Sequence, residues 1–122
     1  MKRICSLAAA TALIAASSGG AALAAKTYDT TISISYSRGS GAFAGDVGSK
    51  HHACVTGRKV TVYRQQSGKD SAVGSDRSSA NGSWKVNPPG KVAAGDYYAK
   101  TASVQLGAKV CRGARSVTTH AS

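Results

Sequence analysis

Apolar and polar side chains alternate with a period of two in short blocks along this chain, and Gly, Ser, Asn and Asp separate the blocks. Ile32, Ile34 and Tyr36, for example, share one parity in residues 28–36. Such alternation is typical of β-strands that bury one face and leave the other in water. Helical periodicity is missing after residue 25, so the pattern predicts an all-β protein. The predicted strands are residues 28–36, 43–47, 58–64, 72–75, 83–86, 95–101, 104–106 and 115–119.

Turn signals divide these strands at regular intervals. Asn81-Gly82 predicts a two-residue hairpin, because both central positions of a type I′ turn need positive φ. The two prolines within residues 87–90 end the strand before them, since proline has no N–H to donate to a neighbouring strand. Seven or so short strands with turns between them predict a β-sandwich.

The first 25 residues have the pattern of a cleaved signal peptide. Lys2 and Arg3 precede an apolar run over residues 4–16, and Ala22-Leu23-Ala24 forms an Ala-x-Ala cleavage pattern. We therefore expect residues 1–25 to be removed and residues 26–122 to form a single domain that is secreted, extracellular or periplasmic. No later apolar run reaches the length of about 20 residues that a membrane-spanning helix needs.

Two cysteines remain after the predicted cleavage. Cys5 leaves with the signal peptide, and export brings Cys54 and Cys111 into an environment where thiols oxidise. Cys54 precedes the strand at 58–64 and Cys111 precedes the last strand, so a disulfide would join two loops at one end of the sandwich. In the chain-entropy model, a disulfide that closes a loop of this length stabilises the folded protein by about 4 kcal/mol.

The chain is strongly basic, with 16 lysines and arginines against five acidic residues, all of them aspartate. Removing Lys2 and Arg3 leaves 14 cations and a net charge of +9, which implies anionic partners or surfaces. The cations are scattered, and the basic stripe with interleaved aromatic residues that favours nucleic acid is missing. We expect no specific nucleic-acid binding.

Four motifs resemble those of the carboxypeptidase regulatory-like, or transthyretin-like, domains. They are Gly-x-Val at 45–47, Cys followed by Gly-Arg-Lys-Val-Thr-Val at 54–62, Asn-Gly-Ser-Trp-Lys-Val at 81–86 and Gly-Asp-Tyr-Tyr-Ala at 95–99. Their order and spacing are similar over residues 42–119. The resemblance implies an Ig-like, Greek-key sandwich that is non-catalytic and occurs as an appendage or a stand-alone secreted module. Where many of those domains carry a proline before the Val-x-Val strand, this chain has Cys54.

No catalytic constellation is found in the sequence, and we expect a non-enzyme without a cofactor. Most of the aspartates lie beside Gly or Ser in turn-like contexts, and no serine lies in a Gly-x-Ser-x-Gly elbow. The transthyretin-like group includes hydrolases of a urate derivative that share a Tyr-Arg-Gly-Ser terminus. Residues 118–122 of this chain are Thr-Thr-His-Ala-Ser, which does not match that terminus.

Adjacent histidines offer an alternative function. His51 and His52 lie near Cys54 and could supply ligands to Cu or Zn. Oxidation of Cys54 removes the sulfur ligand, and neighbouring side chains in an extended segment point in opposite directions. We expect a solvated loop here, with a small secreted metal-binding protein as the alternative and a secreted protease inhibitor as a third possibility.

Outward-facing tyrosines among cations suggest where a partner could bind. Trp84 and Tyr97 have the parity of core residues, whereas Tyr63 and Tyr98 have the opposite parity. A tyrosine ring offers apolar area and a hydroxyl at low entropic cost. We therefore expect a binding or structural module that contacts an anionic polysaccharide or cell-surface polymer. The expected contact residues are Lys59, Tyr63, Arg64, Lys85 and Tyr98.

Overall fold

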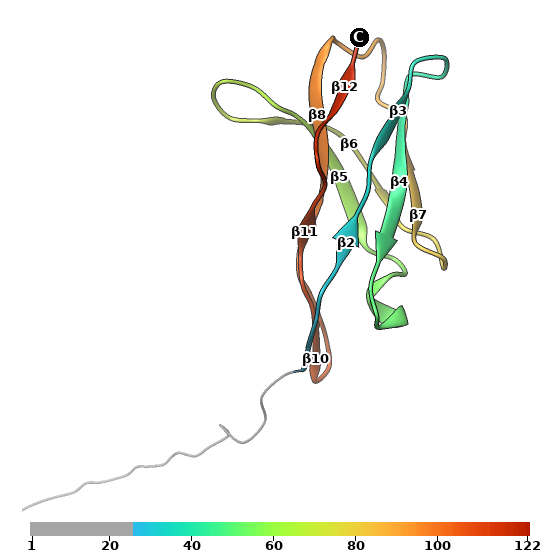
Figure 1. Ribbon diagram of the computed structural model, residues 1–122, viewed down its shortest axis with the longest axis vertical. Helices are drawn as coiled ribbons and strands as arrows, with labels where there is room; N and C mark the ends of the chain where they lie inside the picture. Colours follow the sequence, from blue (N-terminus) through green and yellow to red (C-terminus); the bar gives the residue numbers. More distant parts are fainter. Residues whose placement is uncertain (1–25) are drawn as a thin grey trace, which may run out of the picture.

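A computed structural model describes residues 26–122, and the predicted signal peptide at 1–25 lies outside the described residues (Figure 1). Short strands account for most of the regular structure, together with one 3-10 turn called η2, in agreement with the all-β prediction. The elements are β1 (Lys26–Tyr28), β2 (Thr31–Ile32), β3 (Ser35–Ser37), β4 (Ala42–Gly48), η2 (His52–Cys54), β5 (Lys59–Arg64), β6 (Ser71–Arg77), β7 (Ser83–Val86), β8 (Gly95–Thr101), β9 (Val104–Leu106), β10 (Lys109–Cys111), β11 (Ala114–Arg115) and β12 (Thr119–Ala121).

Two larger sheets form the layers of a β-sandwich. The five-stranded sheet has the order β11-β8-β5-β6, and β12 also pairs with β8. The four-stranded sheet has β2, β3 and β7 paired with β4. Figure 1 shows β8 and β12 in one layer and β4 and β7 in the other. A small third sheet, β1-β10-β9, extends from one end. Greek-key connectivity stays a prediction.

The core lies between the two larger sheets. The rings of Phe43 and Tyr97, which belong to opposite layers, have centroids 4.8 Å apart. Side chains of one parity are buried on β5 and β7, and the predicted burial of Trp84 and Tyr97 is confirmed. The buried cluster comprises Phe43, Val47, Val60, Val62, Trp84, Val86, Tyr97, Ala99 and Ala121.

The hairpin predicted at Asn81-Gly82 is wrong, although the chain does turn there. The strand before the turn, β6, pairs with β5, whereas the strand after it, β7, pairs with β4. The turn therefore connects the two sheets instead of joining two partners in one sheet. Gly82 has φ 92°, and its N–H donates to the carbonyl oxygen of Ser79 at 2.9 Å.

The predicted strand at 28–36 is divided in the structure. Its first part is β1, which pairs in parallel with β10, and only β2 and β3 pair with β4. Ser33 lies between β2 and β3, and its hydroxyl accepts a hydrogen bond from the N–H of Asp46 at 3.0 Å. The predicted strand at 115–119 is likewise replaced by β11 and β12, and β10 has no counterpart among the predicted strands.

The predicted disulfide between Cys54 and Cys111 is confirmed. The two Cα atoms lie 5.4 Å apart, and both residues are fully buried. The bond joins η2 to β10, and thus connects the loop before β5 to the small third sheet. Among residues 26–122, no helix has the length and apolar character needed to cross a membrane.

Candidate functional site

The outer face of the five-stranded sheet carries an unusual concentration of positive charge. On β5, Val60 and Val62 point into the core, so Lys59, Thr61 and Tyr63 occupy the outer face. Residues directly opposite one another on paired strands share a face. The sheet register therefore determines which side chains from the neighbouring strands lie beside these three.

That register brings four exposed cations together. Lys59 lies opposite Arg77 of β6, and Lys100 of β8 lies opposite Arg115 of β11. Lys100 also lies opposite Thr61, which is two residues after Lys59 on β5 and on the same face. Four adjacent strands thus contribute one cation each. We call this row, formed by Arg77, Lys59, Lys100 and Arg115, the cationic stripe.

None of the four cations of the cationic stripe forms an ion pair within 4.0 Å among the described residues, although the positive charge of Arg115 also helps to lower the pKa of the Asp70 carboxyl. Among the described residues, the ion pairs within 4.0 Å are Arg112 with Asp29 and His120 with Asp96. Because like charges that are close together raise the local potential, the stripe favours an anionic partner.

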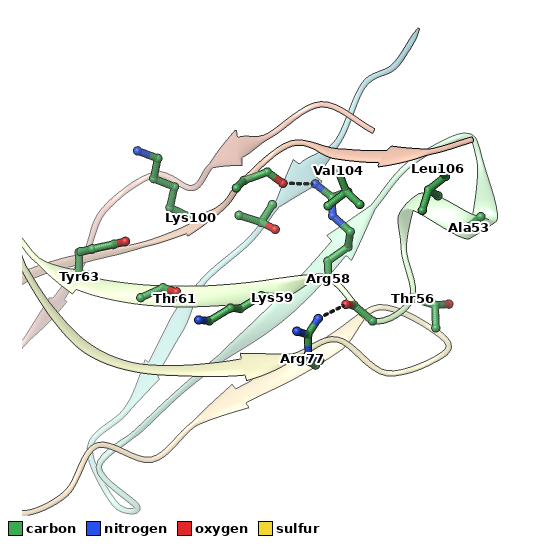
Figure 2. Close-up of a pocket in the computed structure, with 13 residues that line it drawn as sticks. Ala53, Thr56, Arg58, Lys59, Thr61, Tyr63, Arg77, Lys100, Val104 and Leu106 are labelled. Carbon is green, nitrogen blue, oxygen red and sulfur yellow. Dashed lines mark hydrogen bonds between the residues drawn. The ribbon is translucent and has the colours of Figure 1, made fainter. Parts of the chain in front are cut away.

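A groove of about 430 Å³ opens beside the stripe. Lys59, Arg77 and Lys100 line it, and Val104 and Leu106 of β9 contribute apolar side chains. Figure 2 shows the dashed bond that ties the guanidinium of Arg77 to the carbonyl oxygen of Gly57, 2.9 Å away. The groove thus combines fixed positive charge with apolar contact area.

A buried arginine, Arg58, forms part of the groove wall and is only 2% exposed. Its Nη1 donates to the carbonyl oxygen of Cys54 at 2.8 Å and to the hydroxyl of Thr30 at 3.1 Å. Its Nη2 donates to the carbonyl oxygens of Ala102 and Arg112 at 2.8 and 2.9 Å. One side chain therefore holds four separate chain segments at this end of the sandwich.

All four acceptors of the Arg58 guanidinium are neutral oxygens, and its Nε has no hydrogen-bond partner among the described residues. Burial lowers the pKa of Arg58 from its ordinary value, which is so high that the side chain stays charged at neutral pH. An uncompensated positive charge therefore lies next to the groove and adds to the potential of the cationic stripe.

Two tyrosines adjoin the stripe. Tyr63 and Tyr98 lie opposite each other on β5 and β8, and their rings stack with centroids 5.5 Å apart. The guanidinium carbon of Arg115 lies 3.8 Å from the centre of the Tyr98 ring. Tyr98 faces outward as expected from its parity, but Tyr63 and Arg115 cover its ring, and it is only 5% exposed. Tyr63 remains partly exposed.

The hydroxyl of Tyr98 donates a hydrogen bond of 2.6 Å to Oδ2 of Asp70, in the loop between β5 and β6. This bond, and then the N–H of Gln66, lower the pKa of the Asp70 carboxyl. The same bond to Asp70 is the main cause that raises the pKa of the Tyr98 hydroxyl. The one carboxylate beside the tyrosine pair is thus already engaged.

The structure does not bring all five expected contact residues together. Lys59, Tyr63 and Tyr98 share the outer face of the five-stranded sheet. Arg64 has the opposite parity, and its Nη2 donates to the carbonyl oxygen of Ala94 at 3.0 Å. Lys85 belongs to β7 in the four-stranded sheet. The expected patch is therefore divided among different surfaces.

Sequence reasoning missed Arg77, Lys100 and Arg115 as members of the site. Lys100 has the outward parity of Tyr98 within its strand, so alternation alone could have identified it. Arg77 and Arg115 join the face only through strand pairing, which is a long-range property. Arg58 shares the inward parity of Val60, and an arginine at a core position was the available signal that it is buried.

The two histidines of the metal-binding alternative lie away from the stripe. The ring of His51 stacks on Tyr28, with centroids 4.4 Å apart, and His52 begins η2. The sulfur of Cys54 is bonded to Cys111. Within residues 26–122, no group of three or more His, Cys, Asp and Glu side chains is arranged to hold a metal ion.

No known protein family matches this chain, and no curated protein matches its sequence.

Proposed function

We propose that this protein is a secreted, non-catalytic β-sandwich module that binds an anionic cell-surface or extracellular polymer. One observation carries the proposal, namely the cationic stripe on the outer face of the five-stranded sheet. Its four cations come from four adjacent strands, and none of them forms an ion pair within 4.0 Å among the described residues. The transthyretin-like classification and the signal peptide are further parts of the proposal.

A polymer fits this surface better than a small molecule does. The stripe is exposed and extends across the sheet, whereas pockets for small ligands enclose most of the ligand surface. Binding to a linear polyanion sums many weak contacts, each of modest strength in water. A row of separate cations on a rigid sheet supplies such contacts.

A binding role is favoured over catalysis by the chemistry of the groove. Its ionisable side chains are mainly lysines and arginines, which are suited to binding anions, and the described residues that line it include no carboxylate or histidine for general acid–base catalysis. The disulfide supports an oxidising compartment, where structural disulfides persist. The disulfide thus suits a protein that acts outside the cytoplasm.

Retention on a column of immobilised polyanion tests the proposal. We expect the protein to elute as salt is raised from 0.1 M to 1 M, because the Debye length then shrinks from about 10 Å to about 3 Å. The variant Lys59→Glu/Lys100→Glu reverses the two central charges of the stripe. We expect it to elute at markedly lower salt than the native protein.

The matched control is Lys85→Glu/Lys91→Glu, which makes the same change in net charge at two exposed lysines outside the stripe. Thermal unfolding of both variants checks that each one folds. If the two variants lose retention equally, the charge acts diffusely and the proposed site is wrong. Retention that is insensitive to salt would also contradict the proposal.

A further inference from the structure

Resting on the proposed function, we infer that the polymer is an acidic polysaccharide that lies across the strands, from Arg77 on β6 to Arg115 on β11. The five-stranded sheet has the order β11-β8-β5-β6, and each of these strands supplies one member of the cationic stripe. The cations therefore follow one another across the strands, with one diagonal step between Lys59 and Lys100, and not along a single strand.

The spacing of the cations follows from the spacing of the strands. Neighbouring strands lie about 4.8 Å apart, so a stripe across four strands extends over about 14 Å. Lys59 and Lys100 are diagonal neighbours, which adds a step along the strand direction. One strand spacing is close to the length of one pyranose unit in an extended polysaccharide. A polysaccharide with one carboxylate on each unit therefore has a charge spacing similar to the spacing of the strands.

The surroundings of the stripe also favour sugar. Thr61 lies between Lys59 and Tyr63 on the outer face and adds a half-buried hydroxyl. Val104 and Leu106 also line the groove, and Leu106 is 37% exposed. Sugar rings combine hydroxyl groups with apolar C–H surfaces, so they match this mixture of hydroxyl, cation and small apolar side chains. Figure 2 shows Thr61, Val104 and Leu106 around the same groove.

The tyrosine pair argues against single-stranded nucleic acid. Proteins that bind it stack successive bases on open aromatic rings. Here one face of the Tyr98 ring is covered by Tyr63 and the guanidinium of Arg115 lies over the ring as well. Arg115 and Tyr63 thus leave no open surface on Tyr98, which agrees with its 5% exposure. A platform for consecutive bases is not available beside the stripe.

A length series of oligosaccharides measures the footprint. Calorimetric titration at low salt would use oligogalacturonates from the dimer to the octamer. We expect the affinity to rise with length up to about four sugar units and then to level off, because longer chains extend beyond the four strands. The variant Lys59→Glu/Lys100→Glu should bind the octamer at least about tenfold more weakly.

Two double variants test whether the bound polysaccharide lies across the strands or along them. Arg77→Gln/Arg115→Gln removes the two ends of the stripe, and we expect about tenfold weaker octamer binding and an affinity that levels off at shorter chains. Lys69→Gln/Lys109→Gln is the control. Lys69 adjoins Asp70 near the tyrosine pair, and Lys109 lies opposite Leu106 on β10, so these two residues mark the ends of a path along the strands. We expect that control to bind the octamer as the native protein does.

Each other outcome overturns a defined part of the inference. If Lys69→Gln/Lys109→Gln weakens binding and Arg77→Gln/Arg115→Gln does not, the chain runs along the strands and the inferred direction is wrong. If a single-stranded oligodeoxynucleotide with the same number of charges binds as tightly as the octamer, the polysaccharide assignment is wrong. Octamer binding that is unaffected by Lys59→Glu/Lys100→Glu would show that the stripe is not the binding site, and the proposed function fails with it.

Discussion

The Nη1 atom of Arg58 donates a hydrogen bond of 2.8 Å to the carbonyl oxygen of Cys54, so the buried cation and the disulfide hold the same segment. The Nη2 atom reaches the carbonyl oxygen of Arg112, the residue that follows Cys111. Arg58 therefore spans the two segments that the disulfide joins. The end of the sandwich beside the groove is fixed by one covalent bond and by one hydrogen-bonded side chain.

Replacing Arg58 with methionine is expected to destabilise the fold. Arg58→Met leaves the four oxygens without their donor, and a buried polar group that loses its partner costs about 1–3 kcal/mol. Because methionine also removes the cost of burying a charge, we expect a net loss of at least about 2 kcal/mol. Urea denaturation followed by tryptophan fluorescence measures it, since Trp84 lies in the core.

The adjacent residue supplies the control for that experiment. Lys59→Met likewise replaces a cation with methionine, but at an exposed position, and we expect the free energy of unfolding to change by no more than about 0.5 kcal/mol. Equal effects of the two substitutions would mean that the hydrogen bonds of Arg58 contribute nothing to stability.

Removing the disulfide is expected to lower the free energy of unfolding by about 4 kcal/mol, because the unfolded chain regains the freedom of a long loop. The two cysteines are separated by 57 positions. The variant Cys54→Ala/Cys111→Ala should unfold at a lower denaturant concentration than the native protein. Adding a reductant should shift the native protein in the same direction and leave the variant unchanged; no shift in either case would contradict the prediction.

The hydrogen bond between Tyr98 and Asp70 is expected to make stability depend on pH. The hydrogen bond from the Tyr98 hydroxyl is the main cause that lowers the pKa of the Asp70 carboxyl, so the ionised carboxylate is favoured in the folded protein. A carboxyl pKa that is lower in the folded than in the unfolded state adds stability at neutral pH, and this stability is lost as the pH falls through the folded value. We expect Tyr98→Phe to lower the melting temperature at neutral pH and to have a smaller effect in acid.

At alkaline pH, the same hydrogen bond is expected to make the stability of the protein fall as the pH rises. The pKa of Tyr98 is raised, so its neutral form is favoured in the folded protein, and this contribution is lost as the pH rises through the folded value. The pair should therefore stabilise the protein most between the two transitions. Asp70→Asn is the second test, and a melting temperature difference from the native protein that does not vary with pH would contradict the assignment.

Gly82 is expected to resist substitution. A Cβ atom at this position would lie 2.2 Å from the carbonyl oxygen of Val47, and the φ of 92° is strained for any other residue. We expect Gly82→Ala to destabilise the protein by at least about 1 kcal/mol. Gly68→Ala is the control, because no atom lies within 4 Å of the added methyl group in the exposed loop there. Similar losses at both glycines would mean that the contact with Val47 does not determine the effect.

Local patterns in the sequence predicted the strands more successfully than their partners. The alternation of Val60 and Val62 with polar residues is a property of the single strand, and β5 and β8 follow their predicted parity. The Asn81-Gly82 signal identified a turn, because positive φ is a local requirement. It could not show which strands the turn joins, since either sheet can accept the chain after a tight turn.

In the candidate site, too, local patterns identified some residues, whereas others depend on strand pairing. Lys59 and Tyr63 were recognised as outward residues from their own strand, whereas Arg77 and Arg115 reach the stripe through pairings between distant segments. Burial of Tyr98 depends on Arg115, which follows it by 17 positions in the sequence and lies over its ring. Register between strands is set by the packing of the whole sandwich, and no short window of sequence contains that information.

The disulfide also keeps the two fragments together if a protease cuts the chain between Cys54 and Cys111. The loop at residues 65–70 connects β5 to β6 and extends away from the layers in Figure 1, and most of its residues are exposed. A nick after Lys69 leaves Cys54 on one fragment and Cys111 on the other, so the two pieces remain one covalent molecule. The fragments would keep the mass of the intact chain plus one water until a reductant separates them. The protein can thus be cut at this exposed loop and still retain every strand of the described residues.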